Sequence, residues 1–165
     1  MTDIAVTGHM DLAPEAYGPV RARLHEFLAG LRDERLVGRS CLARGADSLF
    51  AEAVLSLGWG LSVIIPSRDY REAVVHAADL ARFDALCEAA DEVTVMPYAR
   101  AGREAYEATT HRLLHGAQRL VAVWDGSAPT GRGGGTADTV AEARSLGLPV
   151  DVVWPAGARR TGGAS

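Results

Sequence analysis

The sequence predicts an α/β protein with a doubly wound, Rossmann-like fold, in which helices cover both faces of a mostly parallel, six-stranded sheet. Short runs of β-branched and aliphatic residues alternate along the chain with segments rich in alanine and leucine. The strand-like runs are almost continuously apolar, which is typical of parallel strands buried on both faces. Because strand and helix alternate throughout, we expect right-handed crossovers between parallel strands.

Six segments have the composition of strands. They are Ile4 to Thr7, Leu36 to Leu42, Leu61 to Ile65, Glu92 to Met96, Leu120 to Trp124 and Val150 to Trp154. The segments between them repeat apolar residues at helical spacing, as in Leu49, Phe50, Ala53, Val54 and Leu57. Each of these segments is predicted to form a crossover helix.

Three helices can be placed more closely. Pro14 opens a helix from Glu15 to about Arg32, because proline fixes φ in a first turn. A second helix runs from about Arg103 to His115. Thr136 is expected to cap the last helix, from Ala137 to Leu146.

The chain of 165 residues is long enough for one domain with a substantial core, which we expect over residues 1–155. Residues 156–165 are rich in glycine and contain the pair Arg159 and Arg160, so they are expected to form a disordered tail. Apolar residues on several sides of the segment 70–90 predict a homodimer or a higher even oligomer. These residues are Val74, Val75, Leu80, Phe83 and Leu86.

The composition, 48% apolar and 23% charged, is that of an ordinary globular domain. No run approaches the roughly 18 apolar residues of a membrane span, and the chain opens into a strand without a secretory segment, so we expect a cytoplasmic protein. A net charge of −4 leaves no broad basic face, and no nucleic-acid partner is expected. Cys41 and Cys87 lack paired spacing with another Cys or His, so neither a metal site nor a disulfide is expected.

The most informative segment is the glycine-rich loop from Asp125 to Thr136, which follows a buried strand and leads into a helix. Glycines allow backbone N–H groups to approach a ligand closely, and a helix N-terminus adds partial positive charge. We therefore predict that backbone groups of this loop hold a phosphate. The residues expected there are Gly133, Gly134, Gly135 and Thr136, with Asp125 and Gly126 at the start of the loop.

Other loops follow strands at the same edge of the predicted sheet, where open parallel sheets bind ligands. Gly8 and Gly45 allow tight turns after the first and second strands. His9, Arg44 and Arg68 are expected to supply polar contacts to a ligand. Asp47 either orients its neighbouring loop or complements the dipole of its own helix.

The helix from about Arg103 to His115 begins after the fourth strand, beside the expected switch point of the sheet. Arg103 or Tyr106 could meet a phosphate, a ribose or a base, and Glu107 could accept hydrogen bonds from ribose hydroxyls or serve as a general acid or base. The alternative is a solvated helix face on which Arg103 pairs with Glu107.

Taken together, these motifs resemble those of the SLOG superfamily, the Rossmann-like group that includes the LOG proteins, DprA and molybdenum-cofactor carrier proteins. The resemblance covers about residues 3–155, and small stand-alone members of the YspA type are most similar. It rests on Val6-Thr7-Gly8-His9, Ala43-Arg44-Gly45-Ala46-Asp47-Ser48, Val123-Trp124-Asp125-Gly126 and Gly134-Gly135-Thr136-Ala137-Asp138-Thr139-Val140. It implies binding or sensing of a nucleotide or nucleotide-derived ligand, a small phosphorylated molecule, with no further cofactor and no settled reaction.

LOG proteins carry a Pro-Gly-Gly-x-Gly-Thr-x-x-Glu motif, whose glutamate works at the glycosidic carbon of a nucleoside 5′-monophosphate. Here Gly135-Thr136 matches the Gly-Thr pair, but Thr139 stands at the glutamate position and Asp138 lies one residue earlier. One residue along a helix turns a side chain by about 100°, so the carboxylate is out of register. The alternative function is therefore a phosphoribohydrolase that uses Glu107 or Asp138, and a weaker alternative is a molybdenum-cofactor carrier.

Overall fold

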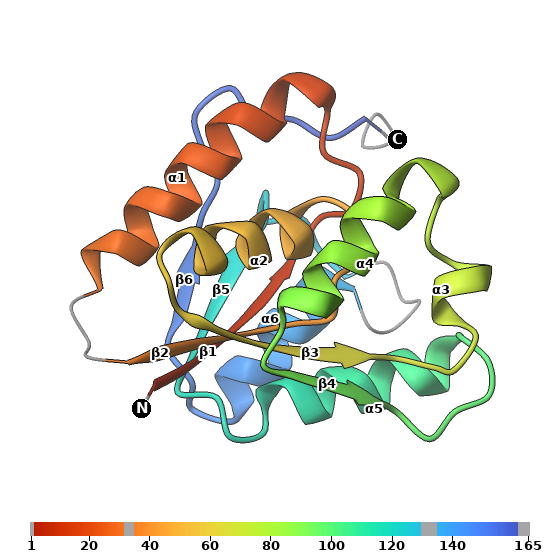
Figure 1. Ribbon diagram of the computed structural model, residues 1–165. Coiled ribbons are helices and arrows are strands. Elements are labelled where there is room, and N and C mark those ends of the chain that lie inside the picture. The colour runs from red at the N-terminus through yellow and green to blue at the C-terminus, as the bar shows by residue number, and fades with distance from the viewer. Residues whose placement is uncertain (1, 32–34, 130–134, 162–165) are drawn as a thin grey trace.

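The computed structural model describes residues 2–31, 35–129 and 135–161 (Figure 1). Its strands are β1 (Thr2–Gly8), β2 (Leu36–Ser40), β3 (Gly60–Ile65), β4 (Glu92–Val95), β5 (Arg119–Val123) and β6 (Val150–Val152). They form one sheet in the order β4-β3-β2-β1-β5-β6, with parallel pairing between all neighbours. This arrangement confirms the predicted doubly wound α/β fold.

Helices lie on both faces of the sheet. They are α1 (Tyr17–Gly30), α2 (Ala46–Ser56), α3 (Tyr70–Ala73), α4 (Leu80–Ala89), α5 (Arg103–Leu114) and α6 (Thr136–Ser145), with short 3₁₀ helices at Pro14–Ala16 and Ala77–Asp79. One face carries α1, α2 and α4, and the opposite face carries α5 and α6 (Figure 1). The chain proceeds outward from β1 to β4 and returns through α5 to β5, beside β1. The switch point of the sheet therefore lies between β1 and β5.

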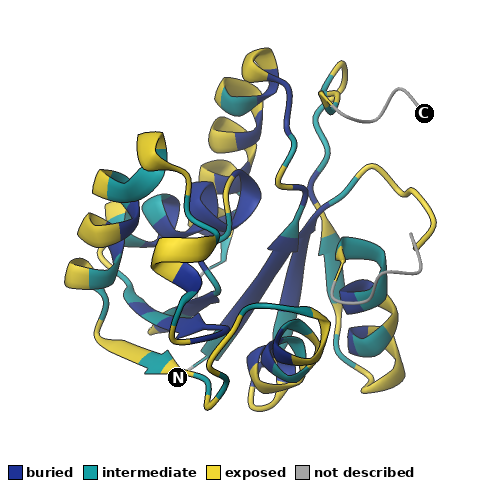
Figure 2. Ribbon diagram, turned by 90° about the vertical axis from the view of Figure 1, so that its right-hand side faces the viewer, coloured by how far each residue is buried: buried dark blue, intermediate teal, exposed yellow. Residues whose placement is uncertain are grey.

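The sheet separates two apolar cores, as the buried residues along its strands show (Figure 2). The larger core joins α1, α2 and α4 to the sheet, and Phe50 and Leu24 are fully buried in it. The smaller core packs Leu113 and Val140 from α5 and α6 against the other face. Gly38 on β2 allows α2 to approach closely, because a Cβ there would lie 2.6 Å from Val54.

Several predicted boundaries differ from the structure by one or two residues, and two of these differences have a clear local cause. The second strand ends at Ser40 rather than Leu42, because Leu42 adopts a positive φ of 54° and leaves the sheet direction. Thr136 does not cap α6: Gly135 occupies the N-cap position and Thr136 is the first helical residue.

The end of the described chain is tied to the loop that follows β1. The N–H of Ala13 donates to the carbonyl of Arg159 at 2.9 Å, and the N–H of Thr161 donates to the carbonyl of Asp11 at 2.8 Å. Leu12 and Arg160 form an antiparallel bridge between these hydrogen bonds. The expected disordered tail therefore differs from the structure over residues 156–161, while residues 162–165 lie outside the described residues.

The apolar residues behind the expected homodimer pack within the chain. Phe83 and Leu86 are buried in the larger core, and Val74 and Val75 pack against it. This removes the argument that the segment 70–90 needs a second copy to cover it. Among the described helices, none has both the length and the apolar character of a membrane span.

Candidate ligand-binding site

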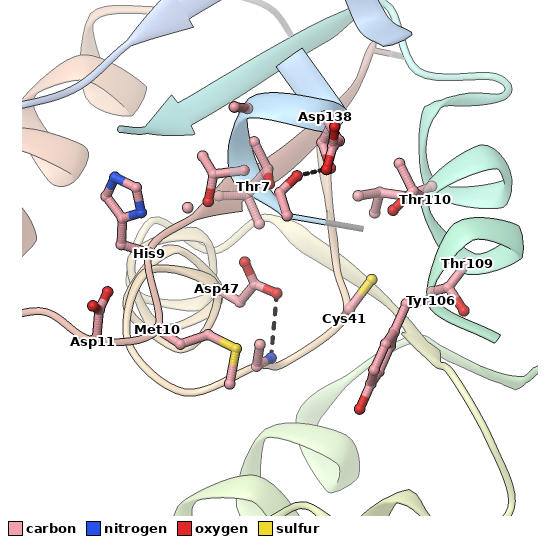
Figure 3. A pocket seen from close by; sticks show the side chains of 18 of the residues that line it. Thr7, His9, Met10, Asp11, Cys41, Asp47, Tyr106, Thr109, Thr110 and Asp138 are labelled. Atoms are coloured by element: carbon pink, nitrogen blue, oxygen red, sulfur yellow. Dashed lines mark hydrogen bonds between the residues drawn. The ribbon is translucent and has the colours of Figure 1, made fainter. Parts of the chain in front are cut away.

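A cavity of about 550 Å³ opens at the carboxyl ends of the strands, at the switch point of the sheet. Its size falls within the range of about 300–1,000 Å³ that is typical of small-molecule sites. The lining comes from the end of β1 and the loop after it, the loop after β2, the start of α2, the segment after β3 with α3, α5, the loop after β5, the start of α6, and Arg160. Figure 3 labels several of these side chains. Of the residues predicted for a site, Gly8, His9, Asp47, Tyr106, Gly135, Thr136 and Asp138 line this cavity.

The first turn of α6 lines the cavity. Gly135, at the N-cap, has the extended conformation φ −77°, ψ 173°, and no side chain among the described residues caps the helix. The N–H of Thr139 makes the first hydrogen bond of the helix, to the carbonyl of Gly135 at 3.0 Å. The amides before it are those that a helix cannot satisfy internally, and they carry the positive end of its dipole. Gly133 and Gly134, also predicted here, lie outside the described residues.

His9 and Asp125 join the ends of the two strands at the switch point. The backbone N–H of Asp125 donates to Nε2 of His9 at 3.1 Å, so His9 is neutral with its proton on Nδ1. Burial and the nearby charge of Arg160 lower the pKa of His9, which agrees with this tautomer. On protonation, Nε2 could instead donate to Oδ1 of Asp125, 3.0 Å away.

Asp125 is ionised at neutral pH. Burial alone would raise the pKa of its carboxyl, but hydrogen bonds from Ser127 and the contact with His9 hold the pKa well below its usual range. The N–H of Ser127 donates to Oδ1 at 2.9 Å. The following residue, Gly126, has a positive φ of 85° that favours glycine, and its role in the turn is conformational.

Arg160 closes one side of the cavity and was not among the predicted site residues. Its Nε donates to Asp11 at 2.9 Å, and its Nη1 lies 3.5 Å from Asp125. The hydrogen bond to Asp11 and the charges of both carboxylates raise the pKa of Arg160. The paired arginines near the end of the chain were visible in the sequence, but their long-range contact with the loop after β1 was not.

Asp47 is a buried acid on the wall of the cavity, with 7% of its surface exposed. Its Oδ2 accepts a hydrogen bond from the N–H of Ala43 at 3.2 Å (Figure 3). Burial raises the pKa of Asp47 to about 7, against the opposing effect of that hydrogen bond. The residue is placed by a turn that requires Gly45, which has a φ of +82° and where a Cβ would lie 2.7 Å from the carbonyl oxygen of His9.

The rest of the cavity is largely apolar or hydroxylic. Tyr106 is predicted from its position on the helix. The lining residues that were not predicted include Met10, Cys41, Tyr70, Val74, Thr109 and Ser127. Thr109 and Thr110 lie about one helical turn after Tyr106, and that spacing was the available signal for them. The hydroxyl of Thr109 already donates to the carbonyl of Ala105 at 2.6 Å.

Seven of the predicted site residues that the structure describes are not among those that line this cavity: Arg44, Gly45, Arg68, Arg103, Glu107, Asp125 and Gly126. Arg44 pairs with Asp79 at 3.2 Å and lines a separate, smaller hollow. Arg68 is exposed after β3. Arg103 and Glu107 pair with each other at 2.9 Å on the exposed face of α5. This is the arrangement expected for a solvated helix face. Because β4 is an edge strand, α5 begins away from the switch point, and its first residues lie outside the cavity.

A second cavity, of about 610 Å³, lies at the opposite ends of the strands. Its buried arginine, Arg39, donates to the carbonyl groups of Arg112 and His115, both at 2.8 Å, and so holds the end of α5. Asp3 lies 3.6 Å from the same guanidinium. These contacts give Arg39 a structural role, and open parallel sheets bind ligands at the other end.

The fold and cavity define a Rossmann-like α/β protein with a candidate site at the switch point of its sheet. Comparisons with known proteins show which solved structures have a similar fold. No protein-family model and no curated protein matches the chain. The solved structure of DNA processing protein A (DprA) from Streptococcus pneumoniae is similar with a TM-score of 0.67 at 19% identity, over 92% of this chain and 50% of that chain. This chain thus spans half the length of that protein.

Two further structures are similar. TM1055, a LOG-family protein, gives a TM-score of 0.59 at 17% identity, over 91% of this chain and 72% of that chain. The structure of DprA from Helicobacter pylori concerns the single-stranded DNA binding mode of that protein. It gives a TM-score of 0.63 at 13% identity, over 92% of this chain and 64% of that chain. All three proteins belong to the SLOG superfamily, which confirms the predicted SLOG-type fold.

The comparisons correct one expectation. The net charge of −4 led us to expect no nucleic-acid partner. That inference is wrong, because two of the similar structures are DprA proteins and one of them binds single-stranded DNA. Overall net charge describes the whole surface and does not report the charge of a local groove.

Proposed function

We propose that this protein binds a nucleotide or a nucleotide-derived ligand in the cavity at the switch point, with a phosphate at the first turn of α6. The observation that carries the proposal is the start of this helix, which opens into a cavity of about 550 Å³ without a side-chain cap among the described residues. Free backbone amides together with a helix dipole form a ready site for an anion.

The charges around the cavity are compatible with an anion. Asp11 and Asp125 are both paired with Arg160, and Asp47 is protonated below about pH 7. Asp138, in the first turn of α6, keeps one buried oxygen, Oδ2, without a hydrogen-bond partner in the part of the chain that the structure describes. A ribose hydroxyl beside the bound phosphate would supply the donor that this oxygen lacks.

The two sides of the cavity also suit the two parts of a nucleotide. Polar backbone groups gather at α6, whereas Tyr70, Tyr106 and Met10 contribute aromatic and apolar surface from other elements. A flat base has an apolar face that such side chains can contact. The mixture favours an amphiphilic ligand over inorganic phosphate alone.

Substitutions at Gly135 test the phosphate site. Among the described residues, a Cβ at this position would meet Asp138 Oδ2 alone, at an ordinary contact distance of 3.7 Å, so both Ala and Asp fit. Gly135→Asp places a negative charge at the helix N-terminus while providing a good N-cap, so the variant should remain folded and bind pyrophosphate and GMP at least about tenfold more weakly. Titration calorimetry measures this directly.

Gly135→Ala is the matched control, because it adds the Cβ without the charge and should retain binding within a few-fold. Equal affinities of the Asp variant, the Ala variant and the parent would mean that the phosphate does not lie at α6.

The second candidate is hydrolysis of the N-glycosidic bond of a nucleoside monophosphate, and the position of Asp138 favours it. Asp138 lines the cavity, whereas Glu107, the other predicted carboxylate, lies outside it. If this reaction occurs, release of free base from a nucleoside monophosphate should be lost in Asp138→Asn and kept in Glu107→Gln. Release that is unchanged in Asp138→Asn would exclude this role for Asp138.

A further inference from the structure

Asp47 places a single carboxyl group in the aromatic and apolar part of the cavity. We infer that Asp47 recognises the ligand's nucleobase, by accepting hydrogen bonds from N–H donors on its edge, and that guanine, with two adjacent donors, is preferred. This inference rests on the proposed nucleotide site and specifies the part of the ligand that lies away from α6.

The geometry leaves Asp47 able to accept from two donors, because each carboxylate oxygen can accept more than one hydrogen bond. Oδ2 accepts the N–H of Ala43, whereas Oδ1 has no hydrogen-bond partner among the described residues and points into the cavity (Figure 3). The backbone around it is fixed, because Ser40 Oγ donates to the carbonyl of Asp47 at 3.1 Å and the N–H of Ala46 donates to the carbonyl of His9 at 3.3 Å. An acceptor that is more than nine-tenths buried is thus held ready at the wall of the cavity.

The surroundings explain why this acceptor would be selective. Cys41, Tyr70 and Tyr106 line the same cavity. In a mostly apolar pocket, a few fixed polar groups decide which ligand is accepted, because a mismatched group loses its hydrogen bond to water without replacement. A base without N–H donors would leave Asp47 unsatisfied.

The cost of Asp47 to the fold also points to a functional use. A buried carboxyl with one hydrogen bond resists ionisation, which is why its pKa is raised to about 7. Such destabilising groups persist where function requires them, and strongly shifted acids gather at binding and catalytic sites. A donor-rich base would compensate the buried negative charge.

The ionisable groups near Asp47 allow its titration to be observed. Burial raises the pKa of Cys41, Tyr70 and Tyr106, and burial lowers the pKa of His9, so these groups move away from the range between pH 6.5 and 8. The other charged side chains lining the cavity are Asp11, Asp138 and Arg160. The phosphate of every nucleotide also ionises at about pH 6, so purine riboside 5′-monophosphate serves as the reference. Because the ionised form of Asp47 is the stronger acceptor, affinity for GMP should rise more steeply between pH 6 and pH 8 than affinity for this reference.

Calorimetry with three nucleotides and pyrophosphate tests the inference. We expect GMP to bind tightest, AMP with one donor group next, and purine riboside 5′-monophosphate, which lacks such donors, at least about tenfold more weakly than GMP. In Asp47→Asn the difference between the bases should disappear and the pH profiles of GMP and purine riboside 5′-monophosphate should become parallel, while pyrophosphate binding is unchanged. Asp84→Asn is the matched control and should behave as the parent. Asp84 is an exposed carboxylate on α4 that pairs with Arg71.

The outcomes separate the two claims. If the parent and Asp47→Asn show the same ranking of bases, or if the three nucleotides bind the parent equally, the inference about Asp47 is wrong even where pyrophosphate binds at α6. If neither pyrophosphate nor any nucleotide binds, the proposed function itself is wrong. Should Asp47→Asn fail to fold, the ranking and the pH dependence of the parent decide: parallel pH profiles for GMP and purine riboside 5′-monophosphate contradict the role of Asp47.

A short single-stranded oligonucleotide containing guanine distinguishes the source of the base. Tighter binding of free GMP identifies a mononucleotide site. Tighter, Asp47-dependent binding of the oligonucleotide identifies a base within a strand, and it supports the same role for Asp47.

Discussion

Asp47 shows how a single residue can link the stability of the fold to its site. The pKa of an aspartate in an unfolded chain is about 3.9, whereas burial raises the pKa of Asp47 to about 7 in the folded protein. Between these values the folded state holds a proton that the unfolded state has released. The contribution of Asp47 to stability is therefore lost as pH rises from about 4 through 7.

Asp47→Asn should consequently stabilise the protein at pH 8, on the order of 2–4 kcal/mol, and should have little effect at pH 4. Asn still accepts the hydrogen bond from Ala43 but carries no charge. Urea unfolding at the two pH values measures the difference. A variant less stable than the parent at pH 8 would show that other groups of the folded protein stabilise the negative charge of Asp47.

At the same scale, the sequence predicted the site residues that directly follow strands. Gly8, His9 and Asp47 line the cavity because the ends of parallel strands meet at one edge of a sheet, which is a property of the fold class. Arg44 and Arg103 do not, because each pairs with a nearby carboxylate. Such pairs depend on side-chain positions that a linear pattern does not specify.

At the scale of elements, the order and type of strands and helices could be predicted because their apolar periodicity is strong. The ends were less certain, since they depend on single backbone conformations such as the positive φ of Leu42. The junction of β1 and α2 illustrates what places the site: a Cβ on Gly8 would lie 2.3 Å from Cβ of Ala46 and 2.8 Å from Cβ of Val123. Gly8 therefore brings the start of α2, and with it Asp47, against the switch point.

At the scale of the whole molecule, the cavity depends on residues at both ends of the chain. Arg160 reaches Asp11, which follows β1, and Asp125, which follows β5. Contacts over such sequence distances leave no periodic signal, and the glycine-rich composition of the C-terminal segment predicts disorder instead. The structure makes this segment part of the candidate site.

Arg160→Gln tests this contribution. Loss of the guanidinium leaves Asp11 and Asp125 unpaired beside the cavity, so we expect GMP to bind about three- to tenfold more weakly, equivalent to roughly 1 kcal/mol. The effect should shrink at high salt because screening weakens these charges. Arg159→Gln is the control, since Arg159 is exposed and pairs with Glu15 outside the cavity. Equal losses in the two variants would assign the effect to net charge alone.

The central claim, that a nucleotide binds at the switch point with its phosphate at α6, is tested most directly by NMR. Amide chemical shifts are followed while GMP, or pyrophosphate in a parallel sample, is added to ¹⁵N-labelled protein. We expect pyrophosphate to change the amide chemical shifts of residues 135–138. GMP should change these and also the amide chemical shifts around Asp47 and Tyr106. Saturable shifts confined to the cavity around Arg39, with the amides of α6 unchanged, would contradict the central claim.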